Sequence, residues 1–364
     1  MADGARVFLR FVGVSLTAEV YCNGKLSVNH KGAFTAFCFE ITDALRPQSN
    51  TLMVKVSNKK DANVTPLAGD FTVFGGIYRP MSLLVLPKVC ISPLDYASPG
   101  VYVSQRKVSA NEAEVDVSAV VDFGKGLVEK CDLATSVHDA TGEDVEVSAT
   151  KSVMTKTSDG RYMLKQTLTL RNPHLWQGVY DPYLYDFKVA LINDGKIIDA
   201  VNQNIGLRSI SVDCRKGLFL NGKPHNIRGV NRHQDRKGKG WAISLDDQLS
   251  DFEFIKEIGA NGVRLAHYPQ ASVVYDLCDK YGVLAWSEIP FVERGNDGNA
   301  AFSHNTKTQL QEMIRQSYNR ASVFCWGLFN ELGEGHPENL VWQLNELAHL
   351  EDPTRVYCGG IKPR

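Results

Sequence analysis

The sequence has no apolar stretch approaching the roughly 18–20 residues that span a membrane, and residues 1–6 lack the basic and then apolar pattern of a secretion signal. It also has no excess of charge of one sign, because 40 lysines and arginines face 41 aspartates and glutamates. A balanced charge provides no general attraction to nucleic acid or to an anionic membrane. We therefore expect neither partner, and the compartment stays open.

Metal-binding and redox patterns are also missing. The eight cysteines are scattered, with no Cys-x-x-Cys pair and no clustering with histidine, and they indicate no disulfide framework. No two histidines have the His-x-x-x-His spacing that places two ligands on one face of a helix. The sequence thus predicts no metal site and no cofactor.

The length and composition indicate a globular protein with two or three domains. The chain has 364 residues, of which 43% are hydrophobic and 22% are charged. Residues 1–88 contain short runs rich in branched and aromatic residues, such as VFLRFV (7–12) and TLMVKV (51–56), and Asn23-Gly24 predicts a hairpin turn. We expect a β domain here.

Residues 89–207 predict a second β domain. From Glu112 to Phe123, small or apolar residues alternate with mostly polar ones, as in a strand of a sandwich with one face in water. Asp194-Gly195 indicates another hairpin turn.

Residues 208–364 alternate between strand-like and helix-like segments, which is typical of a parallel sheet with helical crossovers. Ser244 can cap a helix together with Asp247, and Gly259 can end it. A second helix, with an apolar face spaced as i, i+3, i+4 and i+7, should end at Gly282, and further helices are expected near 305–319 and 337–350. A last strand is expected at 355–358.

Polar side chains follow the first four predicted strands of this sheet. In parallel α/β folds, functional residues gather at the carboxyl ends of the strands. Each position taken alone is as well explained by an ordinary polar loop, but four in succession favour a functional site. They are Asn231, Arg232 and His233, then His267, then Glu288, then Asn330 and Glu331.

A carboxyl group at the end of an apolar strand suggests acid catalysis. Glu331 near Trp326 would suit a general acid if apolar surroundings raise its pKa. Glycoside hydrolysis also needs a second carboxylate, for which Glu288 and Glu293 are the candidates, although a salt bridge or a loop cap is the favoured explanation for each of them. Arg264 should meet a carboxylate if it is buried, but its partner is not evident. His233 and His267 fit either sugar-binding or structural histidines.

At these residues the chain resembles glycoside hydrolase family 2, and most of all its β-galactosidase branch. The resemblance covers nearly the whole chain, and its segments occur in the family's order. They are GGIYR (75–79), LW (175–176), PYLY (182–185), GVNRHQD (229–235), IGANGVRLAHYP (258–269), LCDKYG (277–282), WSEIP (286–290) and WGLFNE (326–331).

The resemblance implies three domains. Residues 1–88 would form part of a jelly-roll sugar-binding domain, residues 89–207 an immunoglobulin-like β-sandwich, and residues 208–364 the amino-terminal half of a (β/α)₈ TIM barrel. The implied substrate is a β-galactoside or a related carbohydrate, hydrolysed with retention of configuration.

The resemblance also implies roles for individual residues. Glu331 matches the acid/base, Asn330 a residue that binds the sugar's 2-hydroxyl, and Arg264 an arginine near the nucleophile. His233 and His267 match residues of the sugar subsite, and Asp70 matches an acidic residue that reaches it from the first domain. We also expect Glu288 to bind the substrate. Asp70 is equally typical of a turn after a glycine. The magnesium-binding Glu-x-His segment of some members is absent, because Glu293 is followed by Arg-Gly.

Length is the main departure from the family. A closed barrel takes about 200–250 residues, and the residues from Leu220 onward are too few for one, so we expect half a barrel. We also expect the family's nucleophile, a glutamate on the seventh strand, to be absent and the chain alone to be inactive. The amino end is expected to begin inside the jelly roll.

Four further hypotheses follow from that departure. The chain could be one half of a split enzyme, or it could self-associate, because half a barrel leaves sheet edges exposed. It could be a carbohydrate-binding protein without catalytic activity. Replacement of the nucleophile by Glu288 is the least favoured hypothesis. The sequence does not choose between galactosides, glucuronides and mannosides.

Overall fold

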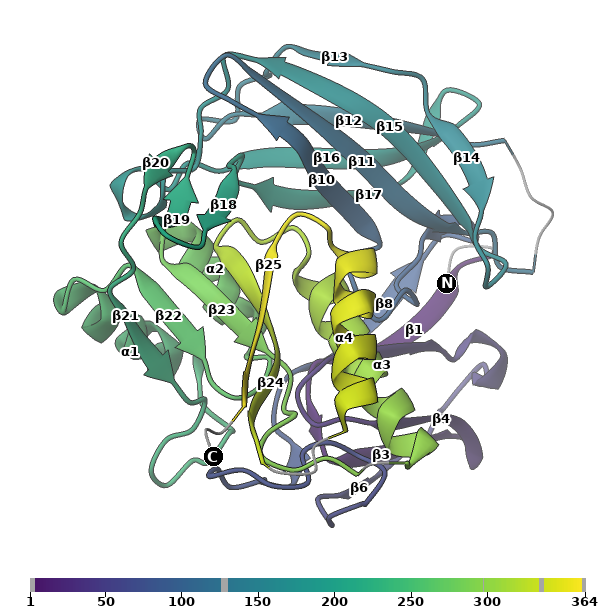
Figure 1. Cartoon of the computed structure of the whole chain (residues 1–364). Coiled ribbons are helices and arrows are strands. Elements are labelled where there is room, and N and C mark those ends of the chain that lie inside the picture. Colours follow the sequence, from purple (N-terminus) through teal and green to yellow (C-terminus); the bar gives the residue numbers. More distant parts are fainter. Residues whose placement is uncertain (1–3, 126–129, 297, 334–336, 362–364) are drawn as a thin grey trace.

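The computed structural model describes residues 4–125, 130–296, 298–333 and 337–361. Three regions follow one another along the chain, and each has a hydrophobic core of its own. Figure 1 shows the second region lying over the other two, with the first region beside the third. Within the described residues, no helix has both the length and the apolar character to cross a membrane.

The first region contains two antiparallel sheets of three strands each. One has the order β5-β1-β8 and the other β4-β3-β6. The Asn23-Gly24 hairpin is confirmed, since both residues have positive φ and join β3 to β4. The strands and short helix are β1 (Arg6–Phe11), β2 (Val14–Ser15), β3 (Thr17–Cys22), β4 (Lys25–Lys31), β5 (Phe37–Glu40), η1 (Thr42–Ala44), β6 (Leu52–Ser57), β7 (Gly76–Ile77) and β8 (Met81–Leu86).

The second region is a pair of antiparallel sheets packed face to face. Along β11 and just beyond its end, the alternate residues from Ala113 to Phe123 are buried as expected. Its outer face is drier than predicted, because Asp116 is also buried and pairs with Arg106 and Lys165. The elements are β9 (Cys90–Ile91), β10 (Val101–Val108), β11 (Glu112–Asp122), β12 (Asp132–His138), β13 (Val147–Ala149), β14 (Val153–Lys156), β15 (Tyr162–Arg171), η2 (Gly178–Tyr180), β16 (Tyr185–Asn193) and β17 (Lys196–Ile205).

The third region contains a five-stranded parallel sheet in the sequential order β21-β22-β23-β24-β25. This order is that of the first half of a (β/α)₈ barrel, as expected. A small antiparallel sheet precedes it. The strands are β18 (Ile210–Asp213), β19 (Gly217–Leu220), β20 (Lys223–Pro224), β21 (Gly229–Arg232), β22 (Gly262–Leu265), β23 (Leu284–Glu288), β24 (Val323–Leu332) and β25 (Val356–Ile361), and the helices are α1 (Leu245–Glu257), α2 (Ser272–Tyr281), α3 (Ala300–Ser317) and α4 (Glu338–Glu351).

The predicted helix ends are confirmed for α1 and α2. Ser244 and Asp247 form a reciprocal capping box at the start of α1, and Gly282 ends α2 in the left-handed conformation. The third helix begins at Ala300, five residues earlier than predicted. Its start is set by Asn299, whose side chain accepts hydrogen bonds from the backbone N–H groups of Ala301 and Phe302.

We predict that Ser244→Ala lowers the free energy of unfolding by about 1 kcal/mol. The hydroxyl accepts from the backbone N–H of Asp247 at 3.2 Å, and alanine would leave that donor without its cap. Urea denaturation followed by circular dichroism measures the change. Ser272→Ala is the matched control. Ser272 is the first residue of α2, and the N-cap position of that helix is Ala271, which makes no side-chain cap. An equal effect in the two variants would contradict this role of the capping box.

Two strands run further toward the polar motifs than predicted. The strand expected over 323–329 continues to Leu332, so Asn330 and Glu331 lie on β24 itself. Likewise, β21 includes Asn231 and Arg232, which we expected to follow the strand. Backbone pairing with a neighbouring strand extends both, and composition does not reveal such pairing.

The first region packs against the carboxyl edge of the parallel sheet. Thr65, in the segment between β6 and β7, donates its hydroxyl to the carbonyl of Pro290 and its N–H to the side chain of Asn305. Aromatic side chains from both regions form a small core, including Phe34, Phe71, Trp241 and Tyr268. These contacts place the segment that carries Asp70 over the strand ends.

Candidate functional site

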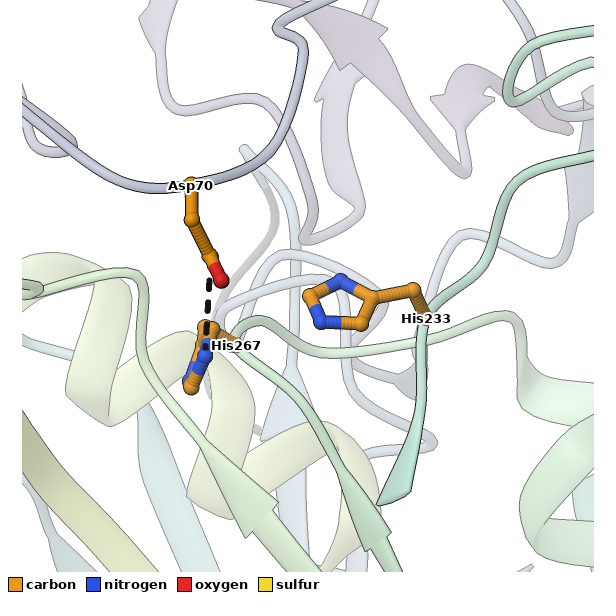
Figure 2. Close-up of side chains that lie close together, drawn as sticks. All are labelled: Asp70, His233 and His267. Carbon is orange, nitrogen blue, oxygen red and sulfur yellow. Dashed lines mark ion pairs between the residues drawn. The ribbon is translucent and has the colours of Figure 1, made fainter.

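The candidate site lies where the ends of four parallel strands meet the segment between β6 and β7. His233 follows β21, His267 follows β22, Glu288 ends β23, and Asn330 and Glu331 lie near the end of β24. Asp70 comes from the first region, far away in sequence. Figure 2 shows Asp70 facing His267, with the ring of His233 directed toward both.

Glu288 is the centre of a charge cluster beneath this surface. It is 1% exposed, and both of its carboxylate oxygens accept hydrogen bonds from Arg264, at 3.0 and 3.1 Å. The same Arg264 donates to Oδ1 of Asn330 at 2.7 Å. Arg264 therefore meets the carboxylate partner that the sequence left unidentified, and it links three neighbouring strands. This pairing compensates the charge of the buried carboxylate, which would be strongly destabilising without a partner.

The carboxylate of Glu288 also determines which ring nitrogen of His267 carries the hydrogen. Nδ1 of His267 lies 2.6 Å from Oε1 of Glu288. A carboxylate ion only accepts, so Nδ1 must carry the hydrogen and donate it. Nε2 of His267 then faces outward, 3.8 Å from Oδ1 of Asp70. We expected Glu288 to contact a sugar, but its burial places it behind His267 and Arg264, in a position to orient them.

Asp70, His233 and His267 form the outer part of the site. One nitrogen of each ring and a carboxylate oxygen of Asp70 all lie within 4.8 Å of one another. The side chain of Asp70 is 72% exposed, whereas His267 is nearly buried. Partial burial, which disfavours the charged ring, lowers the pKa of His233 below its ordinary value of 6.5. His233 is therefore neutral at pH 7 and presents a lone pair.

The burial predicted for Glu331 is not formed. Glu331 is exposed, while Trp326 is completely buried and donates its indole N–H to Asp352. Both Glu331 and Glu293 have positive φ, of 50° and 58°. Such a conformation is uncommon for glutamate, and residues held in it cluster at functional sites. Backbone hydrogen bonds hold these two segments together, because the N–H of Glu293 donates to the carbonyl of Asn330.

Gly327 is a functional position that the sequence analysis missed. A Cβ there would lie 2.4 Å from Cβ of Glu288 and 2.5 Å from Nε1 of Trp286. Only glycine lets β24 approach the buried carboxylate so closely. Phe71 was also missed, although its ring lies 6.2 Å from that of His267 and 6.3 Å from that of His233. The sequence did contain a hint of this role, because Gly327 interrupts a run of large apolar residues in β24.

Three family models match the chain in succession. The model for the sugar-binding domain of glycosyl hydrolases family 2 matches residues 1–87, a second model described as glycosyl hydrolases family 2 matches 99–208, and the model for the family's TIM barrel domain matches 212–359. They confirm the expected architecture. Our own boundaries, after residues 88 and 207, stay predictions.

Individual relatives refine the comparison. A β-glucuronidase of Bacteroides fragilis is 44% identical over 97% of this chain and 51% of its own length, and a β-galactosidase of Thermoanaerobacter pseudethanolicus is 31% identical over 99% and 46%. A crystal structure of a putative β-galactosidase from B. fragilis has a TM-score of 0.91 at 39% identity, covering 99% of this chain and 54% of that one. The chain thus spans about half the length of these relatives.

The expected β-galactosidase branch is not the best interpretation, because the relative at 44% identity is a β-glucuronidase. The wider assignment does not depend on that choice. Three successive models of one family cover nearly the whole sequence. The chain belongs to the glycosyl hydrolases of family 2.

Proposed function

We propose that the chain carries the sugar subsite and the acid/base residue of a retaining β-glycoside hydrolase that acts on β-glucuronides. The observation that carries the proposal is the convergence of Asp70, His233 and His267 above the Arg264–Glu288 pair. Hydrogen-bond acceptors from two regions face one another there, which suits the hydroxyls of a sugar. The 44% identity to a β-glucuronidase supports glucuronides over galactosides.

The proposal gives each side chain a task. Asp70 and Nε2 of His267 accept hydrogen bonds from sugar hydroxyls. Because Oδ1 of Asn330 already accepts from Arg264, its amide N–H groups remain to donate to a further hydroxyl. Glu288 and Arg264 position His267 and Asn330 from below. Glu331 is the proton donor to the leaving oxygen.

Hydrolysis of a chromogenic β-glucuronide by the purified chain tests the reaction. We expect Glu331→Gln to reduce any turnover by about 10²–10⁴-fold, because the general acid is lost. Comparison with the matching β-galactoside ranks the two sugars, and preference for the galactoside would contradict the glucuronide assignment. If the chain has no turnover, sugar binding becomes the measurement.

Calorimetric titration with glucuronate and with galactose measures binding directly. We expect glucuronate to bind and Asp70→Ala to abolish binding, since Asp70 is exposed and its loss spares the core. Binding without turnover would favour the carbohydrate-binding hypothesis. Absence of both binding and turnover, in a folded sample, would overturn the proposal. A split enzyme and self-association stay predictions.

A further inference from the structure

The outer part of the site has the composition of a transition-metal site. Its three side chains come from separate elements: Asp70 precedes β7, His233 follows β21 and His267 follows β22. Their ligand atoms lie within 4.8 Å of one another, and Figure 2 shows the three side chains converging. No spacing rule finds such a set, because the tertiary structure alone brings these residues together.

Glu288 already orients the ring of His267 for a metal. Nδ1 donates to Oε1 of Glu288 at 2.6 Å, so in the neutral ring the lone pair is on Nε2, on the side of Asp70. Metal-binding histidines characteristically donate their other ring N–H to a carboxylate, which fixes the ring and raises its basicity. Arg264 in turn holds Glu288 in place by donating to both of its carboxylate oxygens.

The side chains of His267 and Asp70 also face each other. When the ring of His267 is neutral, its Nε2 and Oδ1 of Asp70, 3.8 Å apart, are both acceptors, and His233 adds a third lone pair. A cation or a set of hydroxyls between them satisfies all three. We propose that Asp70, His233 and His267 bind one zinc-class divalent transition-metal ion, and that Glu288 orients His267 by accepting from its Nδ1.

The donor set selects the class of metal. Two imidazoles and one carboxylate suit zinc and its neighbours, whereas calcium and magnesium prefer oxygen ligands. Metal–ligand bonds of about 2.0–2.2 Å require the three groups to draw closer together. Asp70 is 72% exposed on a segment outside the sheet, so it is the ligand able to move. Three protein ligands leave a fourth position for water.

Such an ion would exclude a sugar from the subsite. It would occupy the same lone pairs that, in the proposed function, accept the sugar hydroxyls. Mutual exclusion therefore rests on the proposed function, whereas metal binding does not. The site would make the protein sensitive to free zinc.

Zinc titration of the metal-free, untagged chain, with a competing fluorescent indicator, tests the site. We expect one zinc ion per chain, and at least tenfold weaker binding in both Asp70→Asn and His267→Ala. Asp70→Asn keeps the size of an exposed side chain, so it separates loss of a ligand from loss of folding. His304→Ala is the matched control, because His304 is exposed on α3 and is outside the group. Calcium should not compete.

Zinc affinity equal to that of the unmodified chain in both Asp70→Asn and His267→Ala would overturn the proposal, as would a loss in His304→Ala of the same size. Binding of cobalt in place of zinc gives a second readout, since a tetrahedral site with two imidazoles produces intense visible absorption that should vanish in His267→Ala. Titration of glucuronate into the zinc-loaded chain then tests whether the sugar and the zinc ion exclude each other from the subsite. Zinc binding that glucuronate does not displace would count against the shared subsite, and not against the metal site.

Discussion

Glu288→Gln is expected to lower the free energy of unfolding of the third region by about 3 kcal/mol. Removing one partner of a buried ion pair leaves the other charge uncompensated, at about 3–5 kcal/mol. Glu288 is 1% exposed, while the Arg264 side chain is 28% exposed, which places the effect at the lower end. Glutamine also presents an N–H₂ group to the donors of Arg264 and His267, where the carboxylate presented only acceptors.

Urea denaturation followed by tryptophan fluorescence measures this loss. The signal reports on the third region, because four of the five tryptophans, Trp241, Trp286, Trp326 and Trp342, lie after residue 208. Glu331→Gln is the matched control, since that carboxylate is exposed and its replacement should change stability by less than about 0.5 kcal/mol. In Arg264→Met/Glu288→Gln, part of the loss should be recovered. A change below about 1 kcal/mol in Glu288→Gln would show that the pair is not a main support of the site.

Gly282→Ala is expected to destabilise the protein by about 2–5 kcal/mol, the sum of two effects. Gly282 has φ of +72°, a left-handed conformation that disfavours any Cβ. A Cβ would also lie 2.1 Å from both the carbonyl carbon and the oxygen of Gly178, in η2 of the second region. Backbone atoms cannot rotate aside as a side chain can, so the two regions would have to separate locally.

Gly259→Ala separates the two contributions. Gly259 also follows a helix and has φ of +69°, but a Cβ there would meet nothing within 4 Å. It should therefore lose only the conformational part, about 1–2 kcal/mol. Urea denaturation of both variants gives the difference, which measures the close contact between η2 and the end of α2. Equal losses would mean that the contact relaxes without a penalty.

Local patterns were enough to place most elements. The hairpins at Asn23-Gly24 and Asp194-Gly195, the cap at Ser244 and the helix end at Gly282 are decided by residues within a few positions of each other, so the sequence reveals them. The motifs at the strand ends also indicated the correct family. Strand boundaries at β21 and β24 were less accurate, because ladder pairing depends on the neighbouring strand.

The chemistry of the site was only partly predictable. The sequence alone determined a glycosidase-family chain of three regions, with polar side chains at the carboxyl ends of a parallel sheet. The tertiary structure decided that Arg264 pairs with Glu288, that Glu288 lies beneath His267 and that Glu331 is exposed. It also brought Asp70 to the two histidines from a region far away in sequence. An ion pair or a ligand set depends on which strands are adjacent and where their side chains point, and no local pattern contains that information.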